Sequence, residues 1–307
     1  MSKKKTVILA LLVMFLWGSL FPMVKLGYQA YQISTSGDIL LFAGIRFTIC
    51  GGIICLFSLI KDRKNYIPVK SSILPILLSG LLAIVLHYAF TYIGLRYIES
   101  SKTAILKQVG TLFYVIFSAL FFKGDKLTLK KFIGVILGFV GIIVINISDE
   151  VISIHIGDIL ILLASFCTVF SNIITKKVVQ KVEPITATGC SQLFGGIVLL
   201  SVGLAMGGSV QMVFDWSILI MVYICVASIF GYCIWYSISK TEDLSNLSII
   251  KFAEPLFSCI LGAVILKEDI FRMQYLIGLL LIVFGVVISQ YRKTKRVDEK
   301  EERTKGR

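Results

Sequence analysis

One stretch of sequence decides the fold: residues Ser101 to Asn146, SKTAILKQVGTLFYVIFSALFFKGDKLTLKKFIGVILGFVGIIVIN, have a second copy in residues Ser245 to Gln290, SNLSIIKFAEPLFSCILGAVILKEDIFRMQYLIGLLLIVFGVVISQ. A shift of 144 positions aligns the two copies without a gap and superposes Lys107 on Lys251. An internal repeat of this length, in a chain this apolar, is typical of a transporter rather than of a short-period solenoid. The sequence therefore predicts two homologous halves.

The composition indicates a protein that sits in lipid. Hydrophobic residues make up 57% of the chain and charged residues 16%, and the mean hydropathy is +0.89. This leaves too little polar surface to cover a soluble globule. All 7 cysteines lie in apolar runs without a CxxC pair, so we interpret them as small buried residues. No nucleotide-binding, metalloprotease or serine-hydrolase motif is present in the sequence, so we expect no cofactor, no metal site and no catalysis.

Apolar runs long enough to cross a hydrocarbon core of ~30 Å follow one another along the chain. They predict ten transmembrane helices, at about residues 6–26, 37–60, 73–92, 102–122, 131–147, 157–175, 186–206, 216–236, 246–266 and 273–290. Five helices per copy is an odd number, so the second copy must enter the membrane from the opposite face. The predicted fold class is therefore an all-α integral membrane protein with ten transmembrane helices in two inverted five-helix repeats. The first repeat covers residues 1–148, the second covers 149–291, and a charged tail covers 292–307.

The charges between the helices predict the orientation of the chain. With both termini in the cytoplasm, 23 of the 31 Lys and Arg residues lie in inside segments, 5 in outside segments and 3 within helices. This bias follows the positive-inside rule and accounts for the net charge of +13. We therefore expect a multi-pass protein of the cytoplasmic membrane. The basic tail also carries acidic residues, so we interpret it as a solvated segment near anionic lipid and expect no nucleic acid partner.

Short motifs in these helices resemble the drug/metabolite transporter superfamily, and within it the EamA-type ten-helix transporters. The resemblance covers residues 7 to 290 and rests on Trp17–Pro22 (WGSLFP), Arg46–Phe47, Tyr92–Leu95 (YIGL), Glu254–Pro255 and Lys267–Glu268. It implies a ten-helix exporter built from two five-helix repeats. The chain departs from the family pattern at Thr111 and Gly124, where the family often has Pro and Glu. The helix predicted at 102–122 is therefore expected to be less kinked than its counterpart at 246–266.

Three charged residues inside predicted helices begin the candidate substrate site, because charge in hydrocarbon usually faces a cavity or a partner. Lys107 and Lys251 occupy matching places in the two repeats, and Glu254 lies one turn beyond Lys251 on the same helix face. Pro255 donates no backbone hydrogen bond, so it is expected to free the carbonyl of Lys251 and to act as a hinge, as Pro22 is in the first helix. The alternatives are that the lysines snorkel to the interface and that the prolines are purely structural kinks.

Five further residues complete the candidate substrate site. Arg46 either binds substrate or ties its helix to polar neighbours. His87 either handles a proton, since histidine titrates near neutral pH, or packs in a hydrogen bond. Tyr88 and Tyr232 are superposed by the same shift of 144 positions, which favours symmetric places around the pathway. Trp17 belongs to the motif of the first helix.

These residues predict a secondary transporter of a small organic metabolite that works by alternating access without ATP. Three cations lie within helices, Arg46, Lys107 and Lys251, and the one carboxylate of Glu254 cannot neutralise them all. An organic anion or an amino acid is therefore the favoured substrate. Sugar-phosphate translocators of the wider superfamily hold phosphate with lysines at these two places and an arginine after the second. Here Phe252 follows Lys251, which favours a carboxylate over a phosphate dianion.

Three other function classes stay open at this point. A multidrug exporter of cationic compounds would use an exposed glutamate and an aromatic cage without lysines. A lipid-modifying membrane enzyme would need a carboxylate pair or a metal cluster, and Glu254 is the only acidic residue well inside a predicted helix. A channel would need a ring of like charges. The expected partners are the small-molecule substrate and membrane lipid, with protons as the coupling ion and a homodimer as open alternatives.

Overall fold

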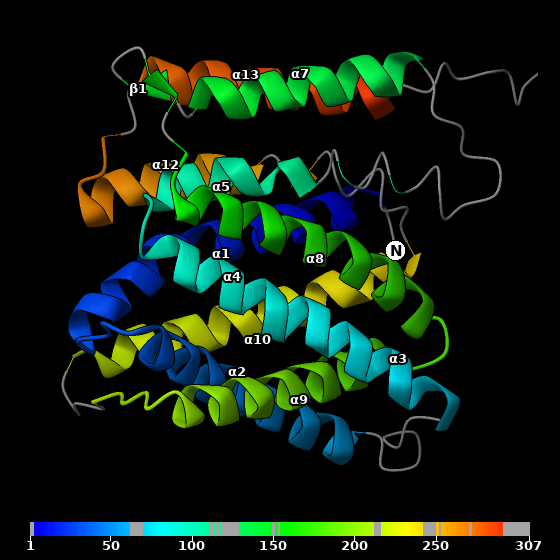
Figure 1. Cartoon of the computed structure of the whole chain (residues 1–307). Helices are drawn as coiled ribbons and strands as arrows, with labels where there is room; N and C mark the ends of the chain where they lie inside the picture. The colour runs from blue at the N-terminus through cyan, green and yellow to red at the C-terminus, as the bar shows by residue number, and fades with distance from the viewer. Residues whose placement is uncertain are drawn as a thin grey trace, which may run out of the picture.

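The computed structural model describes residues 3–61, 70–110, 113, 117, 129–145, 147–148, 151–152, 154–211, 216–241, 250–251, 253–269 and 272–290. Within these residues, six helices are long and apolar enough to cross a membrane, and three shorter apolar helices accompany them (Figure 1). The chain is therefore an almost entirely helical, multi-pass membrane protein, as its composition predicts.

The described elements follow the predicted apolar runs. They are α1 (Lys3–Ala30), α2 (Ser36–Lys61), α3 (Lys70–Gly80), η1 (Leu81–Leu86), α4 (His87–Leu95), α5 (Ser100–Lys107), α7 (Leu129–Ile145), β1 (Ile147–Ser148), β2 (Val151–Ile152), α8 (Ile156–Val178), α9 (Pro184–Ala205), α10 (Ile218–Thr241), α12 (Ala253–Leu266) and α13 (Met273–Gln290). Strands β1 and β2 form one short antiparallel ladder, which the sequence reading did not anticipate.

The helix predicted at 73–92 carries a π-helical segment in its middle, η1, between α3 and α4. Segments of this kind are single-turn interruptions that recur at functional sites. The segment begins where Gly80 packs against α9, since a Cβ on Gly80 would lie 2.7 Å from the Ser191 carbonyl oxygen. It ends at His87, so this interruption sets the direction in which His87 and Tyr88 point.

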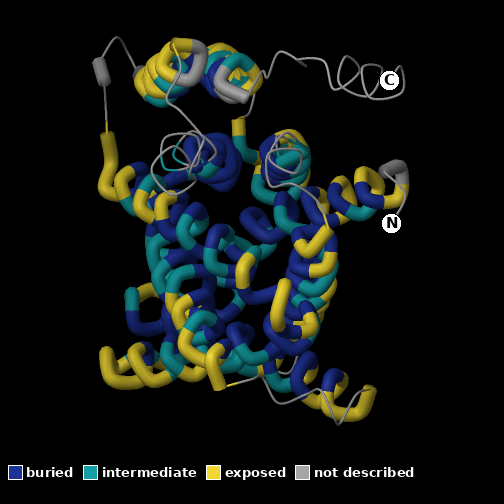
Figure 2. Tube along the Cα trace, turned by 90° about the vertical axis from the view of Figure 1, so that its right-hand side faces the viewer, coloured by how far each residue is buried: buried dark blue, intermediate teal, exposed yellow. Residues whose placement is uncertain are grey.

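Helices α7 and α13 form a layer of their own beside the main bundle (Figures 1 and 2). Glycines bring their backbones together: Gly141 faces Gly278, and Gly285 faces Gly134. The contacts run in opposite directions along the two helices, which are therefore antiparallel. Small residues are what allow such close approach between helices in lipid.

Another antiparallel pair, α2 and α9, forms the side of the main bundle farthest from α7 and α13 (Figure 1). Gly203 of α9 lies so close to α2 that a Cβ there would be 2.5 Å from the Leu41 backbone nitrogen. Further along the pair, Gly51 packs on Leu193 and Gly196 packs on Thr48. Figure 2 shows buried residues gathered inside the bundle and exposed ones on its outer faces. The exposed residues include large apolar side chains such as Val264, which is 74% exposed, as expected where lipid forms the surroundings.

Candidate functional site

A central cavity opens among α1, η1, α4, α5, α8, α10 and α12. It encloses about 1170 Å³, including the part of its mouth that is open to solvent. Seven of the ten candidate residues line it: Trp17, His87, Tyr88, Lys107, Tyr232, Lys251 and Glu254. Arg46, Pro22 and Pro255 do not. The wall also includes Gln108, Thr168, Ser171 and Asn172, which the sequence analysis did not single out.

Lys107 and Glu254 form an ion pair across the boundary between the repeats. Lys107 Nζ lies 3.4 Å from Glu254 Oε1, and the two side chains are 16% and 5% exposed. The ammonium also lies 4.8 Å from the centroid of the Phe21 ring, within range of a cation–π interaction. The alternative in which Lys107 snorkels away to the interface does not describe this structure, since its head group points to a partner in the cavity wall.

Lys251 has a different environment. Its Nζ lies 4.7 Å from the centroid of the Trp235 ring, and it makes no ion pair within 4 Å with any carboxylate among the described residues. Trp235 is itself 3% exposed, so the ammonium rests on a buried aromatic face. Among the lining residues that the structure describes, two lysines, Lys107 and Lys251, therefore face one carboxylate, Glu254.

Helix interruptions place both lysines. In the first repeat α5 ends at Lys107, and Gln108 adopts a turn in which its amide donates to the Ile105 carbonyl at 3.0 Å. In the second repeat Lys251 lies in the turn before α12 begins at Ala253. The helix of the first repeat is thus interrupted directly after the lysine without any proline. The expectation that it is less kinked than its counterpart depends on Thr111, which lies outside the described residues.

The prediction that the Lys251 carbonyl is free is wrong. The amide of Glu254 donates to that carbonyl at 3.0 Å, so the group is satisfied within the turn. Pro255 is the third residue of α12, where a missing amide hydrogen costs little because the first amides of a helix have no helical partner. Pro22 lies inside α1, which is assigned as one helix from Lys3 to Ala30. Neither proline ends a helix or bounds the cavity.

Close approach of α1 to α12 holds Glu254 in place. A Cβ added to Gly18 would lie 2.6 Å from the Glu254 carbonyl oxygen and 2.9 Å from Phe257 Cβ. Only a glycine allows the two helices to meet at this point. The WGS stretch therefore contributes its glycine to the position of the carboxylate and its tryptophan to the cavity wall.

Aromatic rings line the other part of the cavity. Trp17 packs against Tyr232 and Trp235, with ring centroids 5.4 and 5.3 Å apart. The Tyr232 hydroxyl donates to the Tyr88 hydroxyl at 3.1 Å. Tyr88 and Tyr232, which the shift of 144 positions superposes, therefore meet directly in the cavity wall.

His87 lies in the cavity wall, and Arg46 lies behind it. His87 Nδ1 lies 3.1 Å from the Ala164 carbonyl oxygen and 2.9 Å from Thr168 Oγ1, so this nitrogen carries its proton and ties α4 to α8. Arg46 is fully buried, and its Nε donates to Ser228 Oγ at 2.9 Å. Its guanidinium stacks behind the ring of Tyr88 at 5.3 Å. Of the two interpretations of Arg46, this geometry is that of a tie between helices.

One end of the bundle holds a cluster of ion pairs and hydrogen bonds. In the sequence, its lysines serve only as evidence for the orientation of the chain. Lys102 Nζ lies 2.9 Å from Asp158 Oδ1, and Asp158 is 1% exposed in the first turn of α8. Asp158 is therefore buried as Glu254 is, although it lies at the start of a helix rather than well inside one. Glu268 lies in the same region and accepts hydrogen bonds from Ser100 and Ser101. The partners stand far apart in the chain, so no local pattern in the sequence relates them.

Known proteins resemble the chain over nearly its whole length. The model of the EamA-like transporter family matches residues 4–147 and 155–291. A protein of Archaeoglobus fulgidus named "Uncharacterized transporter" is 26% identical over 292 residues, covering 93% of this chain and 98% of that protein. The "Probable amino-acid metabolite efflux pump" of Escherichia coli strain K12 is 26% identical over 304 residues, covering 95% of this chain and 96% of that protein.

A solved crystal structure shares the fold, with a TM-score of 0.65 and 16% sequence identity over 94% of this chain and 97% of that chain. At this identity the likeness concerns the fold alone. The two family matches together cover both copies of the repeat and nearly all of the helices. The chain belongs to the EamA-like transporter family.

Proposed function

We propose that this chain is a secondary exporter of a small organic metabolite that carries a carboxylate, an organic anion or an amino acid, across the cytoplasmic membrane. It works by alternating access between two inverted five-helix repeats, at residues 1–148 and 149–291, with both termini in the cytoplasm. No reaction is catalysed, and no ATP is consumed. The observation that carries the proposal is that Lys107, Lys251 and Glu254 meet in one cavity.

The charge of the cavity supports a carboxylate as the group that is recognised. Glu254 already compensates Lys107 through the 3.4 Å ion pair, whereas Lys251 rests on the Trp235 ring. A desolvated ammonium group gains most from an anionic partner with hydrogen-bond acceptors. A substrate carboxylate at Lys251 would supply this partner. An ammonium group on the same substrate would find Glu254 one helical turn away.

Packing between equivalent segments supports the inverted repeat. The contact of Gly141 with Gly278 and that of Gly285 with Gly134 are the same contact under the shift of 144 positions. A pair of contacts related in this way is what a two-fold axis between the copies produces. Because α7 and α13 are also antiparallel, the axis that relates them lies across the helices, which is the arrangement of inverted repeats in transporters.

The relatives support transport and leave the substrate open. The Escherichia coli relative is named for efflux of an amino-acid metabolite, and at 26% identity that name suggests a substrate class for this chain without fixing it. The aromatic wall formed by Trp17, Tyr232 and Trp235 favours a second candidate, export of an organic cation. The two lysines in the same cavity oppose that candidate, because they repel a cationic group.

Thermal stabilisation of the purified protein by metabolites tests the proposal. A ligand that binds only the folded state raises stability by about 2.7 kcal/mol at 100 times its dissociation constant. Carboxylates and amino acids should stabilise the protein, and quaternary ammonium compounds should not. Lys107→Gln and Lys251→Gln should each abolish both this stabilisation and transport at normal expression. The matched control is Lys240→Gln, at an exposed position in the last turn of α10.

Two outcomes would refute the proposal. One is full transport of an organic anion or amino acid by the Lys107→Gln, Lys251→Gln double variant. The other is export of quaternary ammonium compounds by the unaltered protein, which would make the cationic candidate correct. Reporter fusions after Lys64 and near Gly208 test the orientation separately, since the first should report inside and the second outside.

A further inference from the structure

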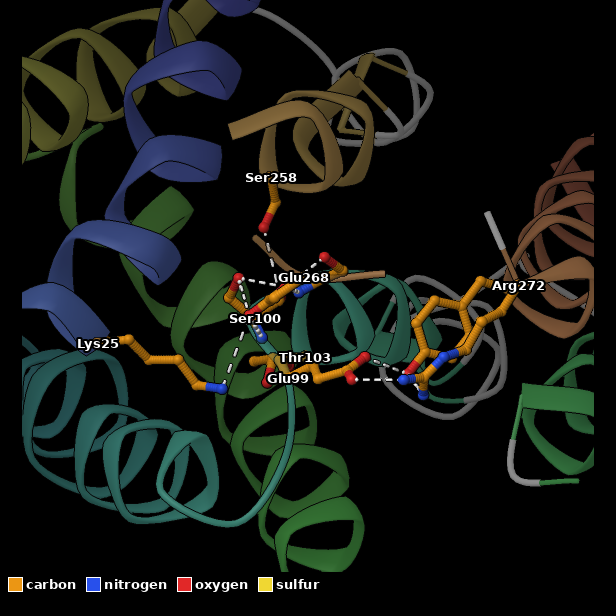
Figure 3. Close-up of polar contacts among 9 residues, drawn as sticks. Lys25, Glu99, Ser100, Thr103, Ser258, Glu268 and Arg272 are labelled. Atoms are coloured by element: carbon orange, nitrogen blue, oxygen red, sulfur yellow. Dashed lines mark hydrogen bonds and ion pairs between the residues drawn. The ribbon is translucent and has the colours of Figure 1, made fainter. Parts of the chain in front are cut away.

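Glu268 is held by more polar contacts than any other residue at its end of the bundle that the structure describes. Its Oε1 accepts from the Ser100 amide at 2.8 Å, and its Oε2 accepts from the Ser101 amide at 3.0 Å and from the Ser101 hydroxyl at 2.5 Å. The Ser100 hydroxyl adds a further bond at 2.8 Å, and Lys25 Nζ lies 3.7 Å away (Figure 3). The side chain is only 7% exposed.

These contacts join the two repeats at the start of α5. The first amides of a helix have no partner within the helix, and the positive end of its dipole favours a carboxylate. Glu268, which follows α12 in the second repeat, supplies that carboxylate to α5 in the first. Gly262 makes room for it, because a Cβ there would lie 2.8 Å from Glu268 Oε2. Lys267, at φ +56°, turns the chain back so that Glu268 reaches the helix end.

The same end of the bundle carries two more ionic ties. Arg272 Nη2 lies 2.9 Å from Glu99 Oε1, and Lys102 Nζ lies 2.9 Å from Asp158 Oδ1. The cluster borders a second hollow of about 600 Å³, whose lining includes Lys25, Glu99 and Glu268. This hollow shares no lining residue with the central cavity. Along α1 and α5 the cluster lies beyond the central cavity, since Phe21 and Lys107 line the cavity and Lys25 and Ser100 contact Glu268.

Three members of the cluster, Lys25, Asp158 and Glu268, have no charged counterpart in the other copy of the repeat. The shift of 144 positions takes Lys25 to Val169 and Asp158 to Met14, both of which are buried and apolar. It takes Glu268 to Gly124, which has no carboxylate. Each of these three charges is therefore present in only one of the two copies of the repeat.

From this asymmetry we infer that Glu268 is the latch of the outer gate, and that releasing its carboxylate from Ser100 and Ser101 opens the central cavity to the outside. The inference rests on the proposed alternating access and on both termini being cytoplasmic, which places the end of α1 and the start of α5 outside. The latched molecule is closed on the outer side, so Glu268 sets which side the cavity faces at rest.

A cysteine in the cavity reports which side is open. Leu20 lines the central cavity on α1, and Leu20→Cys places a reactive thiol there. A charged, membrane-impermeant thiosulfonate is applied to intact cells for the outside and to inverted vesicles for the inside. The same chain without this cysteine gives the background from the native cysteines.

In the Leu20→Cys protein, the reagent should act from the inside and be excluded from the outside. Adding Glu268→Gln keeps the size of the side chain and removes its charge, and it should raise the outside rate at least ~10-fold, since charge-assisted hydrogen bonds are about twice as strong as neutral ones. Ser101→Ala, which removes one donor, should raise it less. The matched control is Asp269→Asn. This neighbouring carboxylate is 66% exposed and lies 3.7 Å from Arg272 Nε, an exposed pair that contributes little, so the variant should leave the rate unchanged.

Three results would overturn the inference. Folded Glu268→Gln and Ser101→Ala proteins, monodisperse on size exclusion, could leave outside labelling unchanged. Glu268→Gln could raise labelling only from the inside, which would mean that Glu268 closes the inner gate and not the outer one. The Asp269→Asn control could match the effect of Glu268→Gln, which would make it a general charge effect. Equal labelling of the unaltered Leu20→Cys protein from both sides would instead contradict alternating access itself, so the two failures are distinguishable.

Discussion

Substitution of Gly18 by alanine should separate α1 from α12 and displace the carboxylate of the cavity. The new Cβ would lie 2.6 Å from the Glu254 carbonyl oxygen, whereas ordinary contact begins at 3.4 Å, so the helices must move apart by roughly 0.8 Å. The neighbour is backbone, which cannot rotate away as a side chain could. Overpacking of this kind costs about 1–3 kcal/mol. Transport should fall as well, because Glu254 shifts relative to Lys107.

Gly52→Ala is the matched control for this prediction. Gly52 lies in α2, and a Cβ there would meet nothing within 4 Å. Alanine in a helix is favoured over glycine by about 0.5–1 kcal/mol, so this variant should be as stable as the parent or slightly more stable. Unfolding of the two variants in mixed micelles gives the free-energy difference directly. Equal stability of the Gly18→Ala and Gly52→Ala proteins, with unchanged transport, would refute the packing argument.

Three further predictions follow from the site and its surroundings. Arg46→Lys should lower the free energy of unfolding by about 1–2 kcal/mol, because lysine loses the planar stacking on the tyrosine rings, yet leave ligand affinity unchanged when both are measured by thermal shift. Pro255→Ala should keep the fold and slow transport only slightly, because the proline occupies a first-turn position; a complete loss of flux in vesicles would restore it as a hinge. Burial alone would raise the pKa of the Glu268 carboxyl, but the hydrogen bonds from two serines hold that pKa below its usual value of 4.5. The stabilisation of the latch by this lowered pKa is complete at pH values above 4.5 and is lost only as the pH falls through the lower pKa. Outside labelling of Leu20→Cys, taken relative to its Glu268→Gln form, should therefore be constant from about pH 8 to about pH 5. The titratable groups facing this carboxyl are Lys25, Glu99, Cys259 and Tyr275.

The sequence could predict the helices because hydrophobic length is a local property. The segments predicted at 37–60 and 273–290 are α2 at Ser36–Lys61 and α13 at Met273–Gln290. The repeat in the sequence also predicts that Lys107 and Lys251 share one site, since equivalent residues in two copies lie at related places, and both line the central cavity. Lipid-facing and buried helix faces are both apolar here, however, so periodicity could not tell which way Arg46 points.

The helix interruptions and backbone hydrogen bonds could not be predicted from the sequence, for a different reason. Proline is a visible signal for a kink, but the interruption after Lys107 has none and depends on how α5 packs against its neighbours. In a regular helix the amide of residue 255 would donate to the Lys251 carbonyl, and Pro255 has no amide hydrogen, so the sequence predicts a free carbonyl. In the structure a tighter turn lets the Glu254 amide donate instead. Glu268 and Ser100 are 168 positions apart, and only the fold brings them into contact.

The cavity breaks the symmetry of the helices around it, and this has a consequence for how a substrate binds. Lys107 and Lys251 are equivalent, but the shift of 144 positions takes Glu254 to Gly110 and Trp235 to Thr91, all of which line the cavity. One lysine therefore has a carboxylate beside it, and the other has an aromatic face. A substrate with one carboxylate and one ammonium group can satisfy both ends in a single orientation, because reversing it would place like charges together. The side chains of the cavity would therefore fix the orientation of such a substrate.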